Sequence, residues 1–293
     1  MMNKVLFSII IPVYNGELYV ERCLNSLLKQ TYSNWEAIIV DNYSEDTTEK
    51  ICCSYKDQRI KYFKFHNHGV IASSRNFGIR KATGNWICFL DIDDWWVNTK
   101  LQKVYEKTTE YEFVYHHLYL YYSEGESFLR KKVSKCYPVK TKEPIGEMLS
   151  MGNPIQTSSV SIKKEKIKEF DVDPKLSGIE DFDLWLQLFK DGISHILIKE
   201  PLGFYNVGNT FSRNFTQILR ERALLSKWFP QLKRKERRQA LLCHFYHSGC
   251  LYYEKRRYVL AIRLWQKSFY SKSKRIKICS ISGIIKAMVR SII

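Results

Sequence analysis

An acidic segment in the first third of the chain is the clearest candidate for chemistry. Asp91, Asp93 and Asp94 fall within four positions, directly after the apolar run Trp86–Leu90. Neighbouring carboxylates repel one another unless a cation neutralises them, and Mg²⁺ or Mn²⁺ can bridge such oxygen ligands to phosphates. An acidic turn leading into a helix is the alternative, because Asp is common as a helix cap. The segment alone leaves both interpretations open, and capping the next helix is the role favoured for Asp94.

A second acidic pair lies further along the chain, at Glu180 and Asp181. The apolar residues after it have the spacing of a buried helix: Phe182, Trp185, Leu186 and Phe189. The dipole of that helix would keep a carboxylate at its N-terminus ionised and able to accept a proton as a general base. A purely structural N-cap is again the alternative.

Four apolar runs rich in β-branched residues predict the strands that carry the first segment. They are separated by three segments with helical periodicity, at Glu17–Gln30, Asp46–Asp57 and Ile71–Thr83. The alternation predicts an α/β fold with a mostly parallel sheet. Ligands bind at the carboxyl ends of such strands, where Asp41 also falls. The strand runs are Val5–Val13, Trp35–Val40, Ile60–Phe65 and Trp86–Leu90.

The later part of the chain changes character. Further strands are predicted at Phe113–Tyr122, Ser158–Ile162 and His195–Ile198. From Asn214 onward the pattern is wholly helical, and two apolar stripes, at Leu242–Tyr253 and Tyr258–Phe269, predict a helical hairpin. We therefore expect an α/β domain over residues 1–213 and a helical C-terminal region over residues 214–293.

Several motifs follow one another over residues 5–212. They include SIIIPVYN at Ser8–Asn15, VDNYSEDT at Val40–Thr47, SRNFGI at Ser74–Ile79, GNWICFLDIDD at Gly84–Asp94 and EDFDLWL at Glu180–Leu186. Read together, they resemble family 2 glycosyltransferases of the bacterial surface-polysaccharide type, which have the GT-A fold. The resemblance therefore implies a mixed, Rossmann-like central sheet flanked by helices.

The resemblance also implies roles in binding the nucleotide. Pro12 and Tyr14 would line the pocket for the nucleobase, and Asp41 would accept a hydrogen bond from it. A carboxylate suits an imide N–H such as that of uracil. Arg75 would help to hold the nucleotide, the alternative being an ordinary surface arginine on a helix.

The resemblance assigns the metal-binding and catalytic roles to the two acidic segments. Asp91, with Ile92 beside it, would contact the ribose or a metal-bound water, and it is the second candidate metal ligand. Asp93 would bind a divalent ion, Mn²⁺ or Mg²⁺, that bridges the two phosphates. Asp181 would be the base, with Glu180 touching the acceptor or the donor sugar.

The reaction implied is an inverting transfer of a hexose or an N-acetylhexosamine. The donor would be a nucleotide sugar, UDP-linked by analogy, and the acceptor a glycan or lipid-linked oligosaccharide in surface-polysaccharide synthesis. Many relatives carry a Tyr-Arg-x-His-like stretch that this chain lacks, since Tyr205–Arg213 reads YNVGNTFSR. A catalytically inactive relative that binds glycans or nucleic acid is the alternative.

Charge is distributed unevenly along the chain, whose net charge is +17. Residues 214–293 carry 19 Lys and Arg against 3 Glu, whereas residues 1–213 carry 28 basic against 27 acidic residues. Such a tail suits an anionic membrane surface, or else packs on this protein or on a second copy in a homodimer. A nucleic-acid partner is disfavoured because the tail's aromatic residues follow helical core stripes. The apolar face predicted for the terminal helix comprises Ile281, Ile284, Ile285, Met288, Val289 and Ile292, near cations at Lys272, Lys274, Arg275 and Lys277.

Compartment signals are few. The eight cysteines lack zinc-type spacing, which favours reduced thiols in a cytoplasmic protein. Neither a signal peptide nor an apolar run of about 18 residues is found. The expected location is the cytoplasm, at the inner face of the cytoplasmic membrane.

Overall fold

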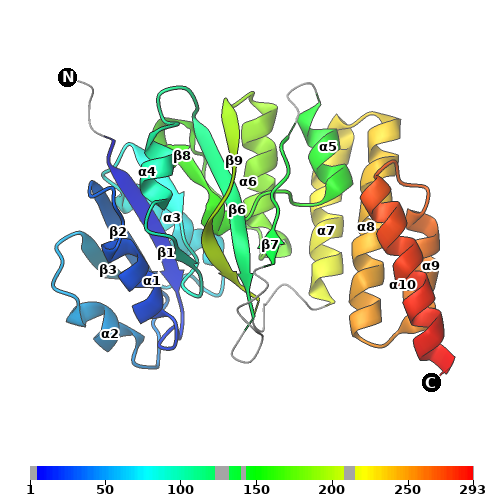
Figure 1. The fold of residues 1–293 in the computed structure, drawn as a ribbon, viewed down its shortest axis with the longest axis horizontal. Helices are drawn as coiled ribbons and strands as arrows, with labels where there is room; N and C mark the ends of the chain where they lie inside the picture. The colour runs from blue at the N-terminus through cyan, green and yellow to red at the C-terminus, as the bar shows by residue number, and fades with distance from the viewer. Residues whose placement is uncertain (1–4, 123–131, 140–142, 208–214, 293) are drawn as a thin grey trace. The chain divides into compact units, whose positions relative to one another are not determined.

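A computed structural model describes residues 5–122, 132–139, 143–207 and 215–292 (Figure 1). The chain divides into two compact units. The first comprises Met1–Pro138, Ile155–Val172 and Asp191–Gly208, and the second comprises Val139–Pro154, Asp173–Lys190 and Asn209–Ile293. The second unit thus takes two segments from the middle of the chain. The domain boundary predicted between residues 213 and 214 lies outside the described residues.

The first unit is built on a mixed sheet with the strand order β3-β2-β1-β4-β8-β6-β9-β5. Its first four strands are parallel and match the four predicted runs. The bounds are β1 Phe7–Val13, β2 Trp35–Asp41, β3 Ile60–Lys64 and β4 Trp86–Phe89, and the helices between them are α1 Val20–Leu28, α2 Thr48–Ser54 and α3 Ile71–Lys81.

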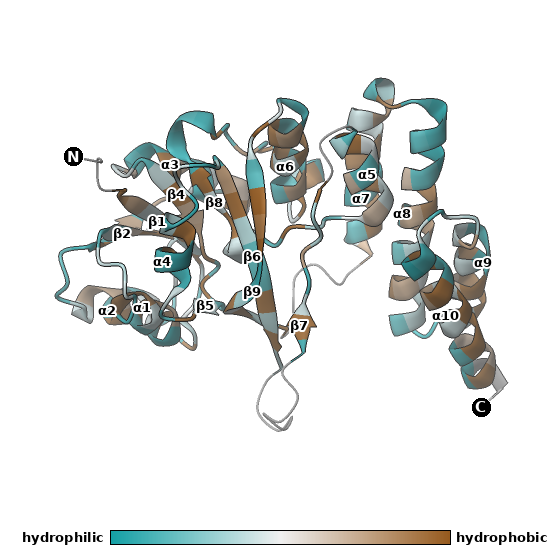
Figure 2. Cartoon of the chain, turned by 45° about the horizontal axis from the view of Figure 1, so that its top comes forward, coloured by the Kyte–Doolittle hydropathy of each residue, from teal (hydrophilic) through white to brown (hydrophobic). Residues whose placement is uncertain are grey.

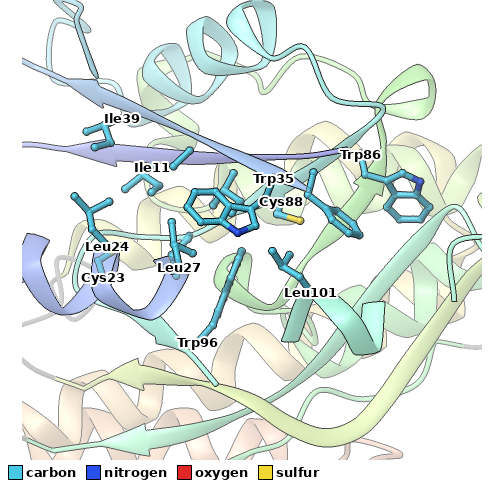
Figure 3. Close-up of a cluster of buried hydrophobic side chains, with 14 of the residues drawn as sticks. Ile11, Cys23, Leu24, Leu27, Trp35, Ile39, Trp86, Cys88, Trp96 and Leu101 are labelled. Atoms are coloured by element: carbon cyan, nitrogen blue, oxygen red, sulfur yellow. The ribbon is translucent and has the colours of Figure 1, made fainter. Parts of the chain in front are cut away.

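Every residue of β1 and β2 is buried, because helices cover both faces of the sheet. Gly78 of α3 lies so close to one face that an added Cβ would approach the Ile10 side chain to 2.5 Å. The opposite face carries the main apolar cluster, to which α1 and α4 (Lys100–Tyr105) contribute (Figure 3). Its labelled members are Ile11, Cys23, Leu24, Leu27, Trp35, Ile39, Trp86, Cys88, Trp96 and Leu101.

The other half of the sheet is irregular. Strand β8 (Ser161–Lys163) runs antiparallel to β4, and β6 (Phe113–Tyr121) pairs with β8 and with the parallel β9 (His195–Asn206). Two short strands were not predicted, β5 (Trp95–Trp96) and β7 (Val133–Ser134). The expected mixed α/β sheet is thereby confirmed.

The second unit is helical. It contains α5 (Pro144–Met151), α6 (Glu180–Lys190), α7 (Thr216–Trp228), α8 (Arg234–Glu254), α9 (Tyr258–Ser268) and α10 (Lys274–Ile292). Helices α8 and α9 form the predicted hairpin, and α10 packs on α9. Gly249 and Gly283 let two helices close on Trp265, since an added Cβ at either would lie 2.7 Å from its ring.

Two features bear on the cellular setting. Among the described residues, no helix combines the length and apolar character needed to span a bilayer. All eight cysteines are free thiols, and five are buried, namely Cys23, Cys52, Cys88, Cys136 and Cys243.

Candidate active site

The carboxyl ends of β1, β2 and β4 lie at one edge of the sheet, because these strands are parallel neighbours. Val13 pairs with Asp41 at this edge. Pro12 is buried within β1, and Tyr14, just beyond the strand, is 54% exposed. Pro12, Tyr14 and Asp41 thus gather where a ligand binds in parallel α/β sheets.

The loops that follow β1 and β2 hold each other in place. The Asn15 backbone N–H donates to Ser44 Oγ at 2.9 Å, and the Glu45 backbone N–H donates to Asn15 Oδ1 at 2.9 Å. Thr48 Oγ1 accepts from the Gly16 backbone N–H at 2.8 Å. The side chains of Asn15, Ser44 and Thr48 therefore fix the backbone around the expected nucleobase pocket.

Asp41 is fully buried and its carboxylate is held from two sides. Oδ1 accepts from the Ser44 backbone N–H at 3.0 Å and from Ser44 Oγ at 2.5 Å, and Oδ2 accepts from the Tyr62 hydroxyl. Burial, together with that bond to Asp41, raises the pKa of Tyr62 and keeps the phenol a donor. Asp41 is therefore part of the support of this loop, and its contact with a nucleobase remains a prediction.

Arg75 is a buried arginine, contrary to the surface alternative. Its side chain is 5% exposed, and Nη2 lies 2.8 Å from Asp91 Oδ1. Its guanidinium also lies 5.5 Å from the centre of the Phe170 ring. The backbone N–H of Asp91 donates to Ser158 Oγ at 3.1 Å. The ion pair thus holds Asp91, and with it the start of the acidic segment.

Asp93 and Asp94 occupy different environments. Burial and the nearby Asp91 charge raise the pKa of Asp93 to about 6. Asp94 is 1% exposed and accepts from the Asn206 backbone N–H of β9 at 2.8 Å, and burial raises its pKa well above the usual range. The helix-capping role favoured for Asp94 is wrong, because α4 begins only at Lys100 and Asp94 instead joins the segment to the sheet.

Two residues near the segment complete its support. Ile92 packs against the main apolar cluster and lies close to Gly16, so its side chain serves packing. Arg22 was not singled out from the sequence. Its Nη2 donates to the Asp93 backbone carbonyl at 2.9 Å, and its guanidinium stacks 3.8 Å from the centre of the Trp95 ring. No motif in the sequence signals that contact, because Arg22 belongs to the amphipathic helix α1.

The acidic segment fits a divalent cation of the kind that a substrate helps to bind. Nowhere in the described ranges do three His, Cys, Asp or Glu side chains converge in a metal-binding arrangement. Mg²⁺ sites in phosphate-handling enzymes commonly use one or two carboxylates, with waters and substrate phosphates as the other ligands. Burial, and next the neighbouring charge of Asp91, raise the pKa of Asp93, and a bound cation would offset that charge.

Glu180 and Asp181 form the first turn of α6, in the second unit. The Gly178 backbone N–H donates to the Glu180 carboxylate, and the Phe182 backbone N–H donates to Asp181 Oδ1 at 2.6 Å. Asn153 Nδ2 donates to Asp181 Oδ2 at 3.2 Å. These hydrogen bonds fix the orientation of both carboxylates at the N-terminus of α6.

Asp183, on the same turn, is a residue that sequence reasoning missed. It is fully buried and accepts from Lys227 Nζ at 2.8 Å, Trp228 Nε1 at 2.8 Å and Gln187 Nε2 at 2.7 Å. Lys227 and Trp228 end α7, so the C-terminal region anchors the turn that carries Asp181. An acidic residue inside a helical apolar stripe was the only available signal.

Three of the described histidines lie in buried or ion-paired surroundings. His116 is fully buried, and desolvation lowers its pKa to about 3. In the second unit, Glu221 Oε2 lies 2.8 Å from His244 Nδ1, and Oε1 lies 3.4 Å from His247 Nδ1. Of the divergent stretch Tyr205–Arg213, residues 208–213 lie outside the described part of the chain.

The model of the family described as glycosyl transferase family 2 matches residues 8–168. The amylovoran biosynthesis glycosyltransferase AmsB of Erwinia amylovora is 32% identical over 223 residues, which are 72% of this chain and 72% of that protein. The UDP-Glc:alpha-D-GlcNAc-diphosphoundecaprenol beta-1,3-glucosyltransferase WfaP of Escherichia coli is 31% identical over 247 residues, 83% of this chain and 92% of that protein.

Two solved structures are similar in fold. TarS residues 1–349 of S. aureus in complex with UDP superposes with a TM-score of 0.61 at 17% identity, covering 96% of this chain and 88% of that one. The mannosyltransferase PcManGT of Pyrobaculum calidifontis, in complex with GDP-Man and Mn²⁺, gives 0.62 at 15% identity, covering 98% and 81%. The likeness confirms the GT-A fold with a C-terminal helical extension.

Proposed function

This chain belongs to glycosyltransferase family 2, and from that premise we propose that it transfers a hexose or an N-acetylhexosamine from a nucleotide sugar to a hydroxyl of a glycan or lipid-linked saccharide. The observation that carries the proposal is the sheet edge where buried Arg75 holds Asp91 beside Asp93. The WfaP relative, named for UDP-Glc and a diphosphoundecaprenol-linked GlcNAc, supports a UDP-linked donor and a lipid-linked acceptor.

In this proposal the first unit binds the donor. Pro12 and Tyr14 flank the nucleobase, Asp41 accepts from its imide N–H, and Arg75 with Asp91 lies toward the ribose and phosphates. Asp93 and Asp91 would hold Mn²⁺ or Mg²⁺, as the Mn²⁺ in the PcManGT complex supports. A bound divalent ion offsets the charge that develops on a departing diphosphate.

Asp181 is the proposed base. The acceptor oxygen attacks the anomeric carbon, the bond from that carbon to the phosphate oxygen breaks, and the nucleoside diphosphate leaves with the electron pair. Asp181 takes the proton of the acceptor hydroxyl, while Glu180 contacts one of the sugars. Because attack comes from the face opposite the leaving group, a single displacement inverts the anomeric configuration.

The proposed setting is the inner face of the cytoplasmic membrane, where surface polysaccharide or lipopolysaccharide precursors are extended. Several of the tail's aromatic residues, which raised the nucleic-acid alternative, pack within the helical unit. Trp265 is 3% exposed, and Tyr246, Tyr252 and Tyr253 pack against its cluster. They are therefore not available as a stacking platform for bases.

A panel of nucleotide sugars tests the proposal. The full chain is incubated with each donor and Mn²⁺ or Mg²⁺, and release of nucleoside diphosphate is measured with and without a chelator. One donor should be turned over, and the chelator should stop it. If every donor in the panel remains intact under all metal conditions, with and without glycan acceptors, the chain is a binding relative instead.

A further inference from the structure

Helix α10 has two apolar faces, and one of them is already used for packing. Ile276, Ser280, Gly283 and Ala287 recur at three- and four-residue spacing and face the hairpin. Ile276 is 3% exposed, and Ser280 and Ala287 are fully buried. Ser280 Oγ lies 2.8 Å from Ser268 Oγ of α9. This inner face gives α10 its place in the helical unit.

The outer face is apolar but exposed. Ile278, Ile281, Ile285, Met288 and Val289 follow the same spacing on the opposite side, and each is between 44% and 65% exposed. The stripe predicted from the sequence was wrong in one member, since Ile284 packs against the Trp265 cluster. Ile292 has no described side chain. The outer face therefore remains about half exposed, whereas the inner face is buried.

Positive charge surrounds this outer face. Lys274, Lys277 and Lys286 of α10 are exposed, and the sequence contains no acidic residue after Glu254. Residues 255–293 hold 11 Lys and Arg. Figure 2 shows the hydrophilic start of α10 followed by hydrophobic residues along the helix. In a homodimer formed through this face, the cations would meet the same cations of the second copy. Residues 255–293 hold no acidic side chain that could pair with them.

We propose that the outer face of α10 docks on the headgroup layer of an anionic lipid bilayer. The helix is about 28 Å long at 1.5 Å per residue, and it would lie flat, with its apolar stripe among the upper acyl chains and its lysines at the lipid phosphates. This inference rests on the proposed function in one respect. Docking would bring the active site to an acceptor that is held in the membrane.

The test uses the full chain, because removing α10 would uncover Trp265. Binding to vesicles of phosphatidylglycerol and phosphatidylcholine is measured by co-sedimentation at low and high salt, against pure phosphatidylcholine vesicles. The charge variant is Lys274→Gln/Lys277→Gln/Lys286→Gln, and its matched control is Lys29→Gln/Lys50→Gln/Lys56→Gln, which changes exposed lysines of the first unit. The apolar variant is Ile281→Gln/Ile285→Gln, matched by Val172→Gln/Leu219→Gln, which are also exposed.

The wild type should bind anionic vesicles at low salt and release at high salt. The charge variant should bind about a hundredfold more weakly and the apolar variant at least about tenfold more weakly, whereas both controls should bind like wild type. Equal loss of vesicle binding in test and control variants would overturn the proposal. It would also be overturned if the wild type formed a dimer that the apolar variant dissociates, or if circular dichroism showed that the apolar variant unfolds. Nucleotide-sugar turnover on a water-soluble acceptor, measured in parallel, reports failure of the proposed function separately.

Discussion

The two acidic turns of this chain resemble each other in sequence and differ in how their charge is compensated. Asp91–Asp94 ends a buried strand, and its members crowd together, so that burial and mutual repulsion raise the pKa of Asp93 to about 6. Glu180–Asp183 begins a helix, where backbone N–H groups, Asn153 and Lys227 donate to the carboxylates. We therefore propose that the first arrangement holds a cation and that the second supplies the proton acceptor.

The largest effect is expected at the strand end. Asp93→Asn should lower turnover at least about a thousandfold, because the divalent ion loses a charged ligand. The thermal unfolding midpoint should not fall, since the substitution removes a carboxylate that burial and Asp91 already disfavour. Steady-state turnover and thermal unfolding check both statements. Undiminished, still metal-dependent activity would place the metal elsewhere.

A substitution in the first turn of α6 should affect the transfer step and leave donor binding unchanged. Asp181→Asn keeps the shape and the acceptor oxygen but is not a proton acceptor, so the transfer rate should fall by about 10²–10⁴-fold. Donor affinity, measured by calorimetry, should stay as in wild type. A loss of donor affinity equal to the loss in rate would show that Asp181 binds the donor. The two acidic turns would then not have separate roles.

The ion pair between Asp183 and Lys227, which holds the first turn of α6, should contribute to the unfolding free energy. Lys227→Met removes one of three donors to the buried Asp183, and because Lys227 is 37% exposed and Trp228 and Gln187 still donate, the cost should be about 2 kcal/mol in unfolding free energy. Lys190→Met, at the exposed end of α6, is the matched control and should cost little. Chemical denaturation measures both. An equal loss of unfolding free energy in the two variants would show that the Asp183–Lys227 ion pair does not hold the turn.

The smallest effect is expected at the nucleobase pocket. Asp41→Asn should weaken nucleoside diphosphate binding by about tenfold to a hundredfold, the worth of a hydrogen bond to a charged group. Tyr62→Phe removes only the internal bond to Asp41, so it separates loop support from base contact. Calorimetric affinities that fall alike in both variants would assign Asp41 to loop support alone.

The sequence predicted the parallel strands well because each is a continuous apolar run buried on both faces, and their ends located the acidic segment. It did not predict contacts between residues far apart in the chain. Asp183 and Lys227 are 44 positions apart, and nothing in the sequence indicates that they pair. The two-residue β5 is too short for periodicity. The α10 stripe was misassigned at Ile284 because the helix is apolar on two faces, so spacing alone did not separate them.

We propose above all that the sheet edge binds a nucleotide sugar together with a divalent ion held by Asp93. Calorimetric titration of the donor found in the panel, into wild type and Asp93→Asn, with Mn²⁺ or with a chelator, tests it most directly. We expect metal-dependent binding in wild type and binding at least about tenfold weaker in the variant. Equal affinity in all four experiments would contradict it.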